Sequence, residues 1–172
     1  LRGNVLTVPL EDNLNVARML KSQGYYTAHL GKYGLAGKKK AKTHPGHPNL
    51  RGFDYFLGYL FHGDPSEHYP RNGTTDMNAF VYENFEKIED AHPDLYTPDL
   101  WTARAKKIIV DETEHNPERP FFLYLAYDTP HRKLQAPPAA YPAGGGIRGG
   151  LQWTGPPAYC NTAAGKPENI DA

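Results

Sequence analysis

The sequence predicts an α/β fold, with a mostly parallel sheet flanked by helices and connected by long loops. A helix-like segment followed by a strand-like segment occurs twice, over residues 13–30 and again over residues 97–127. A polar residue follows each strand, Lys32 in the first unit and His131 in the second. Parallel strands need a crossover, usually a helix, so this alternation favours parallel pairing. The 17 glycines and 16 prolines among 172 residues predict the long loops.

The first unit begins with NLNVARMLKSQ, residues 13–23, in which apolar residues recur at helical spacing. We expect Asn13 to cap this helix and Gly24 to follow its last turn. The next segment, YYTAHL at residues 25–30, is rich in strand-forming residues. Lys32 is therefore expected just past the carboxyl end of a strand, the edge where open α/β sheets bind ligands.

The middle of the chain alternates loops with short apolar segments. Residues 34–50 and 61–79 are rich in polar residues, glycine and proline, and are expected to be loops. Between them, RGFDYFLGYL at residues 51–60 predicts either a strand or a packed turn. Residues 81–88 are expected to form a short strand or one arm of a hairpin.

The second unit starts at Thr97, which we expect to cap a helix with Pro98 as its first residue. An apolar face continues to about His115, and a proline-containing segment then ends the helix. The run FFLYLAY, residues 121–127, is continuously apolar and predicts a buried strand. From Ala136 onward no period is present, so a long loop is expected.

Composition argues against several classes of function. Lys plus Arg and Asp plus Glu both number 19, and this zero net charge argues against general binding to nucleic acids or membrane surfaces. No apolar run reaches membrane-spanning length. The single cysteine, Cys160, excludes an internal disulfide, and no neighbouring histidine activates it as a thiol nucleophile. Walker, GxSxG and HExxH motifs are absent.

Lys32 and His131 are the candidate catalytic and substrate-binding residues. A lysine ammonium is a point charge suited to a tetrahedral oxyanion. A histidine can donate a hydrogen bond to such an anion or act as an acid or base. If their strands are neighbours, both residues lie at one edge of the sheet. The alternative is that they are two unrelated surface residues at strand ends.

Other histidines and lysines favour ordinary loop roles. His44 and His47 in THPGHP lack helical spacing and nearby cysteine or carboxylate ligands, so we interpret them as exposed loop residues rather than metal ligands. HGDPSEH, residues 62–68, would suit a metal loop, a substrate rim or a solvated loop. The basic run at residues 38–42 lacks interleaved aromatic residues and is expected to be solvated.

Three segments, in order, resemble the sulfatase family. LKSQGYYTAHLGKYGLAG (residues 20–37) is similar to that family's Gly-Tyr, Thr-Ala, Gly-Lys-Trp-His-Leu-Gly signature. RGFDYFLGY (residues 51–59) is similar to its Gly-Phe-Asp turn, and RPFFLYLAYDTPHRKLQAP (residues 119–137) to its Pro-Phe-Phe-Leu-Tyr strand leading to Pro-His. The tail, residues 144–172, resembles a loop of some bacterial arylsulfatase-like members.

The resemblance implies an alkaline-phosphatase-like fold and a calcium-dependent sulfuric ester hydrolase with a formylglycine nucleophile. It also implies that Lys32 holds the sulfate group and that His131 contacts the sulfate or the leaving-group side. A cation and a hydrogen-bond donor would stabilise the charge that spreads over the sulfuryl oxygens in the transition state. Gly31 would give the backbone room beside the lysine.

The chain also departs from the family pattern. Tyr33 and Gly34 stand where the family has tryptophan and the histidine that assists the formylglycine. The formylglycine motif, Cys or Ser followed by x-Pro-x-Arg, is not present, and neither are recognisable calcium ligands. We therefore expect residues 1–172 to be the central part of one sulfatase catalytic domain. The nucleophile segment would precede this part and the metal-ligand segment would follow it, leaving it inactive alone.

Two alternative functions stay open. One is hydrolysis of phosphate or phosphonate esters by the same superfamily, because lysine and histidine suit phosphoryl oxygens equally well. The other is non-catalytic binding of sulfated glycans. Under the sulfatase interpretation the substrate is a sulfated small molecule or glycan, with no nucleic-acid or membrane partner, and the resemblance implies a periplasmic or secreted protein.

Overall fold

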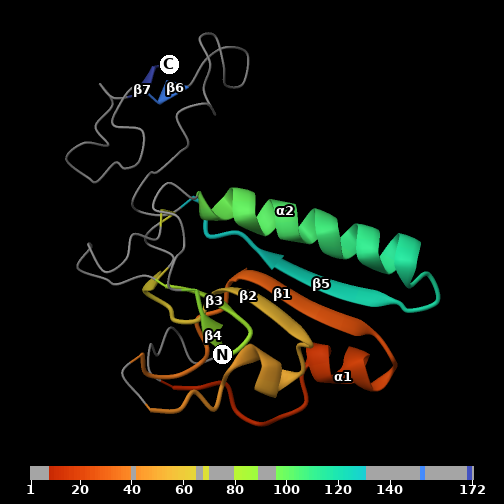
Figure 1. The fold of residues 1–172 in the computed structure, drawn as a ribbon. Coiled ribbons are helices and arrows are strands. Elements are labelled where there is room, and N and C mark those ends of the chain that lie inside the picture. The colour runs from red at the N-terminus through yellow and green to blue at the C-terminus, as the bar shows by residue number, and fades with distance from the viewer. Residues whose placement is uncertain are drawn as a thin grey trace.

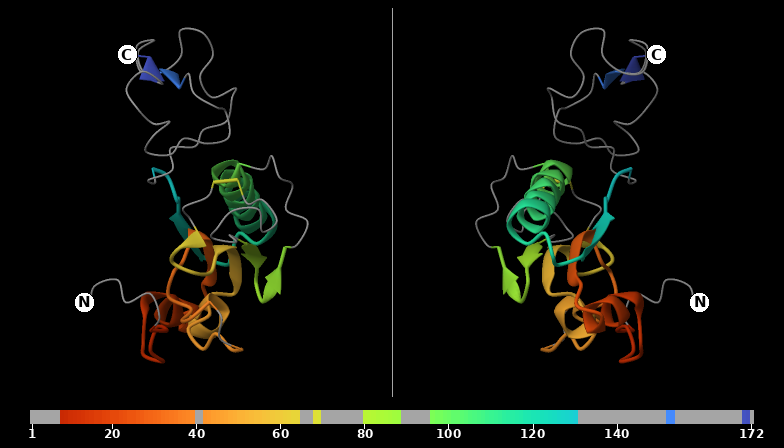
Figure 2. Two further views of the ribbon diagram at one scale, coloured as in Figure 1. Left: turned by 90° about the vertical axis from the view of Figure 1, so that its left-hand side faces the viewer. Right: turned by 90° about the vertical axis from the view of Figure 1, so that its right-hand side faces the viewer.

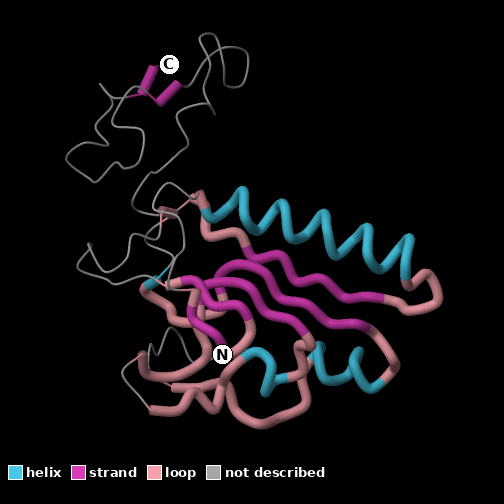
Figure 3. Tube along the Cα trace, in the orientation of Figure 1, coloured by secondary structure: helices cyan, strands magenta, loops and turns pink. Residues whose placement is uncertain are grey.

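The computed structural model describes residues 8–39, 42–64, 68–69, 80–88, 96–130, 152–153 and 170–171. Its main feature is a mixed five-stranded sheet, whose strands are arrows in Figure 1 and magenta in Figure 3. The strand order is β4-β3-β2-β1-β5. The bounds are Tyr26–Lys32 for β1, Tyr55–Tyr59 for β2, Val81–Glu83 for β3, Glu86–Lys87 for β4 and Phe121–Ala126 for β5. The α/β prediction is confirmed.

Strand β1 lies between two parallel neighbours. It pairs with β2, with Lys32 opposite Tyr59, and with β5, with Gly31 opposite Ala126. The two helix–strand units therefore supply parallel strands, as predicted, and the two strands are neighbours in the sheet. Strands β3 and β4 are antiparallel, which confirms the expected hairpin arm.

Helix α1, Val16–Ser22, begins later than predicted. Its cap is Asn15 and not Asn13, because the Asn15 side-chain oxygen accepts a hydrogen bond of 3.0 Å from the Arg18 amide. The Asn15 side chain also donates to the Arg51 carbonyl at 2.9 Å, which ties the helix start to a distant loop. Gly24 has a φ of +84° just after the helix, as its predicted terminal role requires.

Helix α2, Thr97–Val110, continues into one turn of π-helix, η3, at Asp111–His115. The predicted length is confirmed but the predicted cap is wrong. Tyr96 occupies the cap position without a side-chain hydrogen bond, and Thr97 is the first helical residue. The Thr97 hydroxyl is instead buried 3.2 Å from the Asp128 carboxylate.

The helices cover opposite faces of the sheet, as Figure 2 shows, with α2 on one face and α1 with the 3₁₀ turn η1 (Pro48–Arg51) on the other. The larger core lies under α2, where Ala28 and Leu30 of β1 pack with Trp101. No helix in the described ranges is both long and apolar enough to cross a membrane.

Strand β5 is less buried than its apolar sequence predicts. The side chains of its residues are partly or largely exposed, and Tyr124 is 51% exposed. The buried-strand prediction is wrong because β5 pairs only with β1 among the described strands and forms an edge of the sheet.

A short antiparallel pair, β6 (Gln152–Trp153) and β7 (Ile170–Asp171), lies within the segment predicted to be a loop. The remaining residues from 131 onward, with Cys160 among them, are outside the described residues. His92 lies outside them as well.

Two glycines let the central strands approach closely near the end of β1. A side chain at Gly31 would collide with the Ala126 carbonyl of β5, and one at Gly58 would collide with the Gly31 carbonyl. Gly31 also has a φ of +92°, which disfavours any other residue. Glycine is therefore required at position 31 because β5 packs so closely against it, and not only because of the neighbouring lysine.

Candidate functional site

The carboxyl ends of β2, β1 and β5 meet at one edge of the sheet. Lys32 is the last residue of β1, whereas the predicted strand ended two residues before it, at Leu30. Asp128 follows the end of β5 by two residues and His62 follows the end of β2 by three. His131, the second predicted site residue, lies outside the described residues, five positions beyond Ala126. The structure thus brings Lys32 to the edge from which the segment toward His131 leaves.

Lys32 is partly buried and fixed through its backbone. Its carbonyl oxygen lies 3.1 Å from Nε2 of His29, which is buried in the same strand. Within the described part of the chain, no carboxylate pairs with the Lys32 ammonium. A cation without a counter-charge, at the carboxyl edge of parallel strands, is suited to bind an anion.

His29 is a residue to which sequence reasoning gave no role. Burial lowers its pKa to about 4, so the ring is neutral at pH 7. The neutral ring can donate from Nε2 to the Lys32 carbonyl, and its edge packs on Tyr33 and Phe53 with ring centroids 5.2 Å away in each case. His29 thereby holds the last peptide of β1 in place.

A pocket of about 220 Å³ lies beside Lys32 on the α1 face of the sheet. Regular alternation would place Lys32 on the α2 face with Ala28 and Leu30, but the positive φ of Gly31 interrupts the pleat. The wall combines two cations with aromatic rings, from Lys32, Arg51, Tyr33, Phe53, Phe122 and Tyr124. A charged group bound at Lys32 would have an apolar surface next to it.

The segment that follows β5 is anchored by the buried carboxylate of Asp128. His68 Nδ1 lies 2.8 Å from Oδ2, and the Trp101 indole donates to Oδ1 at 3.0 Å. The Thr97 hydroxyl lies 3.2 Å from Oδ2. This network joins α2, β5 and the loop that contains His68. It fixes the start of the segment that leads to His131.

The HGDPSEH segment does not gather into one site in the described residues. His62 is partly exposed near Lys32, the Asp64 carboxylate is buried and bound by the Lys39 ammonium, and His68 contacts Asp128. Burial raises the pKa of Asp64 to about 6 despite the Lys39 charge, which lowers it. Residues 65–67 lie outside the described part.

His44 and His47 are not exposed loop residues, as the sequence suggested. The His44 ring packs on Phe61 at 4.8 Å between centroids, and the His47 ring stacks on Phe85 at 4.5 Å. Burial lowers the pKa of His47 to about 4. Both rings pack against aromatic side chains. The sequence could not show these contacts, because Phe61 and Phe85 are distant from the two histidines in the chain.

A calcium site is not found in the part of the chain that the structure describes. No group of three or more His, Cys, Asp or Glu side chains lies close enough to hold a metal ion there. The acids near the candidate site are already bonded, Asp64 to Lys39 and Asp128 to Trp101 and His68. These residues do not fit a calcium ion, and no chemical step is assigned to one.

The α/β fold and the residues at the carboxyl edge of its sheet together indicate the class of protein. It is an α/β fold in which Lys32, with no carboxylate partner among the described residues, lies at the carboxyl edge of the parallel strands. The family model for sulfatases matches residues 4–164, so the chain belongs to the sulfatase family. Its sheet and helices are part of the alkaline-phosphatase-like α/β fold of that family.

Individual relatives agree with the family assignment. Arylsulfatase J of Mus musculus is 35% identical over 127 residues, covering 73% of this chain and 20% of that protein. Arylsulfatase G of Mus musculus is 30% identical over 152 residues, covering 74% of this chain and 27% of that protein. The chain thus spans between a fifth and a third of the curated relatives it matches.

A solved structure shows the same arrangement. The crystal structure of Ps i-CgsB superposes with a TM-score of 0.55 at 26% identity, covering 79% of this chain and 32% of that one. Its complex with k-i-k-neocarrahexaose superposes with a TM-score of 0.53 at 27% identity. That superposition covers 76% of this chain and 31% of the chain in the complex.

Proposed function

We propose that the full-length protein containing this chain is a sulfatase that hydrolyses a sulfate ester. The observation that carries the proposal is Lys32, a partly buried cation with no carboxylate partner in the described residues, at the carboxyl edge of a sulfatase-family sheet. The ammonium would contact the sulfuryl oxygens, where negative charge is distributed as the ester bond breaks. Family membership and the arylsulfatase relatives support this reaction class.

His131 completes the proposed sulfate-binding pair. Its segment leaves the sheet from β5, the parallel neighbour of the strand that ends in Lys32, and the Asp128 network anchors that segment. A histidine there can donate a hydrogen bond to a sulfuryl oxygen or protonate the leaving oxygen. The pair would bind and orient the ester, and a separate nucleophile would attack the sulfur.

The nucleophile and metal are proposed to be a formylglycine and a calcium ion. Neither belongs to the described residues, whose carboxylates do not fit a metal. We propose that residues 1–172 are the central part of a catalytic domain, with these groups on other segments of the protein. The calcium ion, when bound, would neutralise charge on the sulfate. This chain's own residues would bind the ester and exclude water through the aromatic wall beside Lys32.

The proposed substrate is a sulfated glycan. The similarity to a protein solved with k-i-k-neocarrahexaose supports this choice, as does the aromatic surface next to Lys32, because aromatic rings pack against sugar faces. We further propose that the protein acts in the periplasm or after secretion, where it would encounter such glycans. Cell fractionation of the native host tests this location.

The test is turnover by the full-length protein. Release of inorganic sulfate would be measured with an aryl sulfate and with sulfated oligosaccharides, and an aryl phosphate would be the matched substrate. We expect sulfate release and a much slower phosphate release. Faster phosphate release would identify a phosphate ester hydrolase instead. Binding of sulfated oligosaccharides without sulfate release would identify a glycan-binding protein.

A further inference from the structure

The connections that follow β1 and β2 leave the sheet side by side. Lys32 and Tyr59 are paired at the ends of these strands, and the Tyr33 amide donates to the Tyr59 carbonyl at 3.0 Å. This pairing brings His62, three residues beyond β2, next to the turn that contains Gly34. The contact joins residues 28 positions apart in the sequence.

The turn at Gly34 packs directly against His62, at ordinary van der Waals distance. A Cβ at Gly34 would lie 3.5 Å from Cα of His62 and 3.8 Å from both its Cβ and its Nδ1. A longer side chain at this position would therefore contend with the imidazole for the same space. Gly34 is two residues after Lys32, so the ring lies over the same turn that begins at the lysine.

His62 carries no hydrogen bond or ion pair within the described residues, and its side chain is partly exposed. Burial and the Lys32 charge, in that order, lower its pKa. Asp64, the nearest acid along the chain, does not compensate for that charge, because Lys39 binds its carboxylate. Lys32 and His62 are therefore two neighbouring donors, and no carboxylate of the described residues pairs with either of them.

We propose that His62 is a second anion-contacting residue of the Lys32 site, donating an imidazole hydrogen bond to the same sulfate group that the Lys32 ammonium binds. The proposal rests on the proposed sulfatase function and extends it to a residue from β2. A bound anion would offset the Lys32 charge and favour the protonated ring. Sulfate should then bind with uptake of a proton at His62, and more tightly as pH falls.

The experiment measures binding of inorganic sulfate to the full-length protein by titration calorimetry at pH 5.5, 6.5 and 7.5. The variants are His62→Ala, His62→Gln and Lys32→Ala, with His115→Gln as the matched control. His115 lies at the far end of the sheet, where its ring is 3.6 Å from the Asp111 carboxylate. Circular dichroism and the thermal midpoint check that each variant is folded.

The wild-type protein and His115→Gln should bind sulfate about ten-fold more tightly at pH 5.5 than at pH 7.5. His62→Ala should weaken binding about ten-fold at pH 5.5 and lose most of the pH dependence. His62→Gln keeps an N–H donor but cannot titrate, so it should retain part of the affinity and lose most of the pH dependence, with the rest coming from His131. It also serves as the folded variant if His62→Ala is unstable.

Two results overturn the inference in distinguishable ways. If Lys32→Ala abolishes sulfate binding while both His62 variants match the wild type in affinity and pH dependence, the His62 assignment is wrong and the proposed function stands. If the wild-type protein neither binds sulfate nor hydrolyses sulfate esters, the proposed function fails and the His62 assignment fails with it.

Discussion

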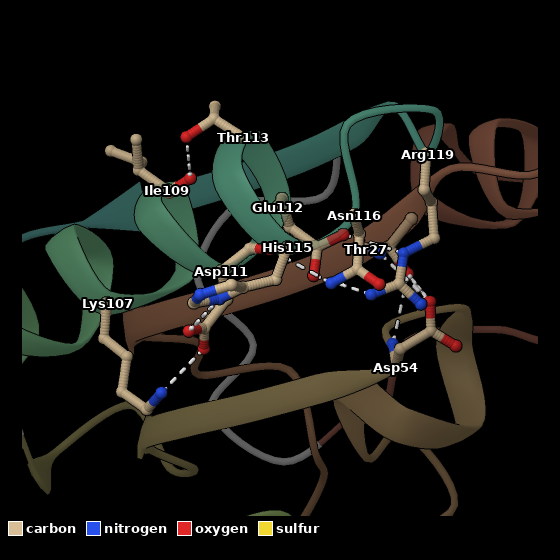
Figure 4. A network of polar contacts seen from close by, with 10 residues as sticks. All are labelled: Thr27, Asp54, Lys107, Ile109, Asp111, Glu112, Thr113, His115, Asn116 and Arg119. Atoms are coloured by element: carbon tan, nitrogen blue, oxygen red, sulfur yellow. Dashed lines mark hydrogen bonds and ion pairs between the residues drawn. The ribbon is translucent and has the colours of Figure 1, made fainter.

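Charged side chains at the amino end of the parallel strands are paired with one another, whereas Lys32 and His62 at the carboxyl end have no carboxylate partner among the described residues. At the amino end, shown in Figure 4, Arg119 holds Glu112 through two hydrogen bonds of 2.7 and 2.6 Å. Asp54 accepts from both the amide and the hydroxyl of Thr27 at 3.0 Å, and Lys107 binds Asp111 at 2.7 Å. At the carboxyl end, Lys32 and His62 have no carboxylate partner among the described residues.

This difference distinguishes an end of the sheet whose charges stabilise the fold from the end at which we propose that the ligand binds. Paired charges at the amino end join α2, β1 and the turns before β2 and β5, and their donors and acceptors are satisfied inside the protein. At the carboxyl end, the described acids Asp64 and Asp128 are bonded to Lys39 and Trp101, and neither neutralises Lys32. An open hollow near residues 115–119 is larger, at about 350 Å³, but its arginine is already bonded to Glu112.

The sharpest test of the comparison is Lys32→Ala in the full-length protein. We expect kcat/KM for a sulfate ester to fall by about 10² to 10³, because a donor to the developing sulfuryl charge is lost. The measurement is steady-state sulfate release, with Lys38→Ala as a control that removes an exposed lysine of the next loop. Unchanged turnover in a folded Lys32→Ala protein would remove this lysine from the site.

Asp128→Ala should cause the largest loss of stability. We expect the free energy of unfolding to fall by about 3 kcal/mol, because the buried His68 and Trp101 donors lose their acceptor. Urea denaturation measures the change, and Asp128→Asn, which keeps one acceptor oxygen, should lose less. Equal stability of the wild type and Asp128→Ala would show that the network does not anchor this segment.

His29 should make the protein less stable in acid. Its pKa is about 4 in the folded state, below the ordinary 6.5, so the unfolded chain binds the proton more readily. Stability present above pH 6.5 is therefore lost as pH falls toward 4, by about 2 kcal/mol at pH 5 from this group alone.

The check is urea denaturation of the wild type and His29→Phe at pH 7 and pH 5. His29→Phe should reduce the loss between these two pH values, whereas His47, whose pKa is also lowered to about 4, continues to contribute in both proteins. The control is the exposed His115→Gln. An identical pH dependence in wild type and His29→Phe would contradict a neutral buried ring.

Arg119→Ala should have the smallest effect and should leave turnover unchanged. Removing the guanidinium strands the buried Glu112 carboxylate, and we expect a loss of about 1 kcal/mol of stability. The double variant Arg119→Ala with Glu112→Gln should recover part of it. A fall in kcat/KM for the sulfate ester that exceeds the loss of folded protein would break the distinction between the two ends.

Local pattern was enough to predict much of the fold. Helical spacing before residue 24, the apolar run at residues 121–127 and the glycines near Lys32 predicted two helix–strand units in the right order. Their parallel pairing followed from the need for a crossover connection. The motif order also predicted the sulfatase family, because three motifs in sequence rarely coincide by chance.

The errors arose where a distant contact overrides a local preference. Thr97 has the side chain of a cap, but the Asp128 carboxylate engages its hydroxyl. Asn13 precedes the helical pattern, but Asn15 caps it because the Arg51 carbonyl holds its amide. The apolar β5 was expected to be buried, yet it has only one strand neighbour in the described sheet.

The sequence by itself determined the types and order of the elements and the presence of Lys32 at a strand end, since these depend on neighbours within a few residues. Only the tertiary structure decided which side chains meet at that edge. His62 reaches the Lys32 turn because β1 and β2 pair in one register, and it packs against that turn at Gly34. Such contacts depend on strand register and on space between distant segments, which no local pattern encodes.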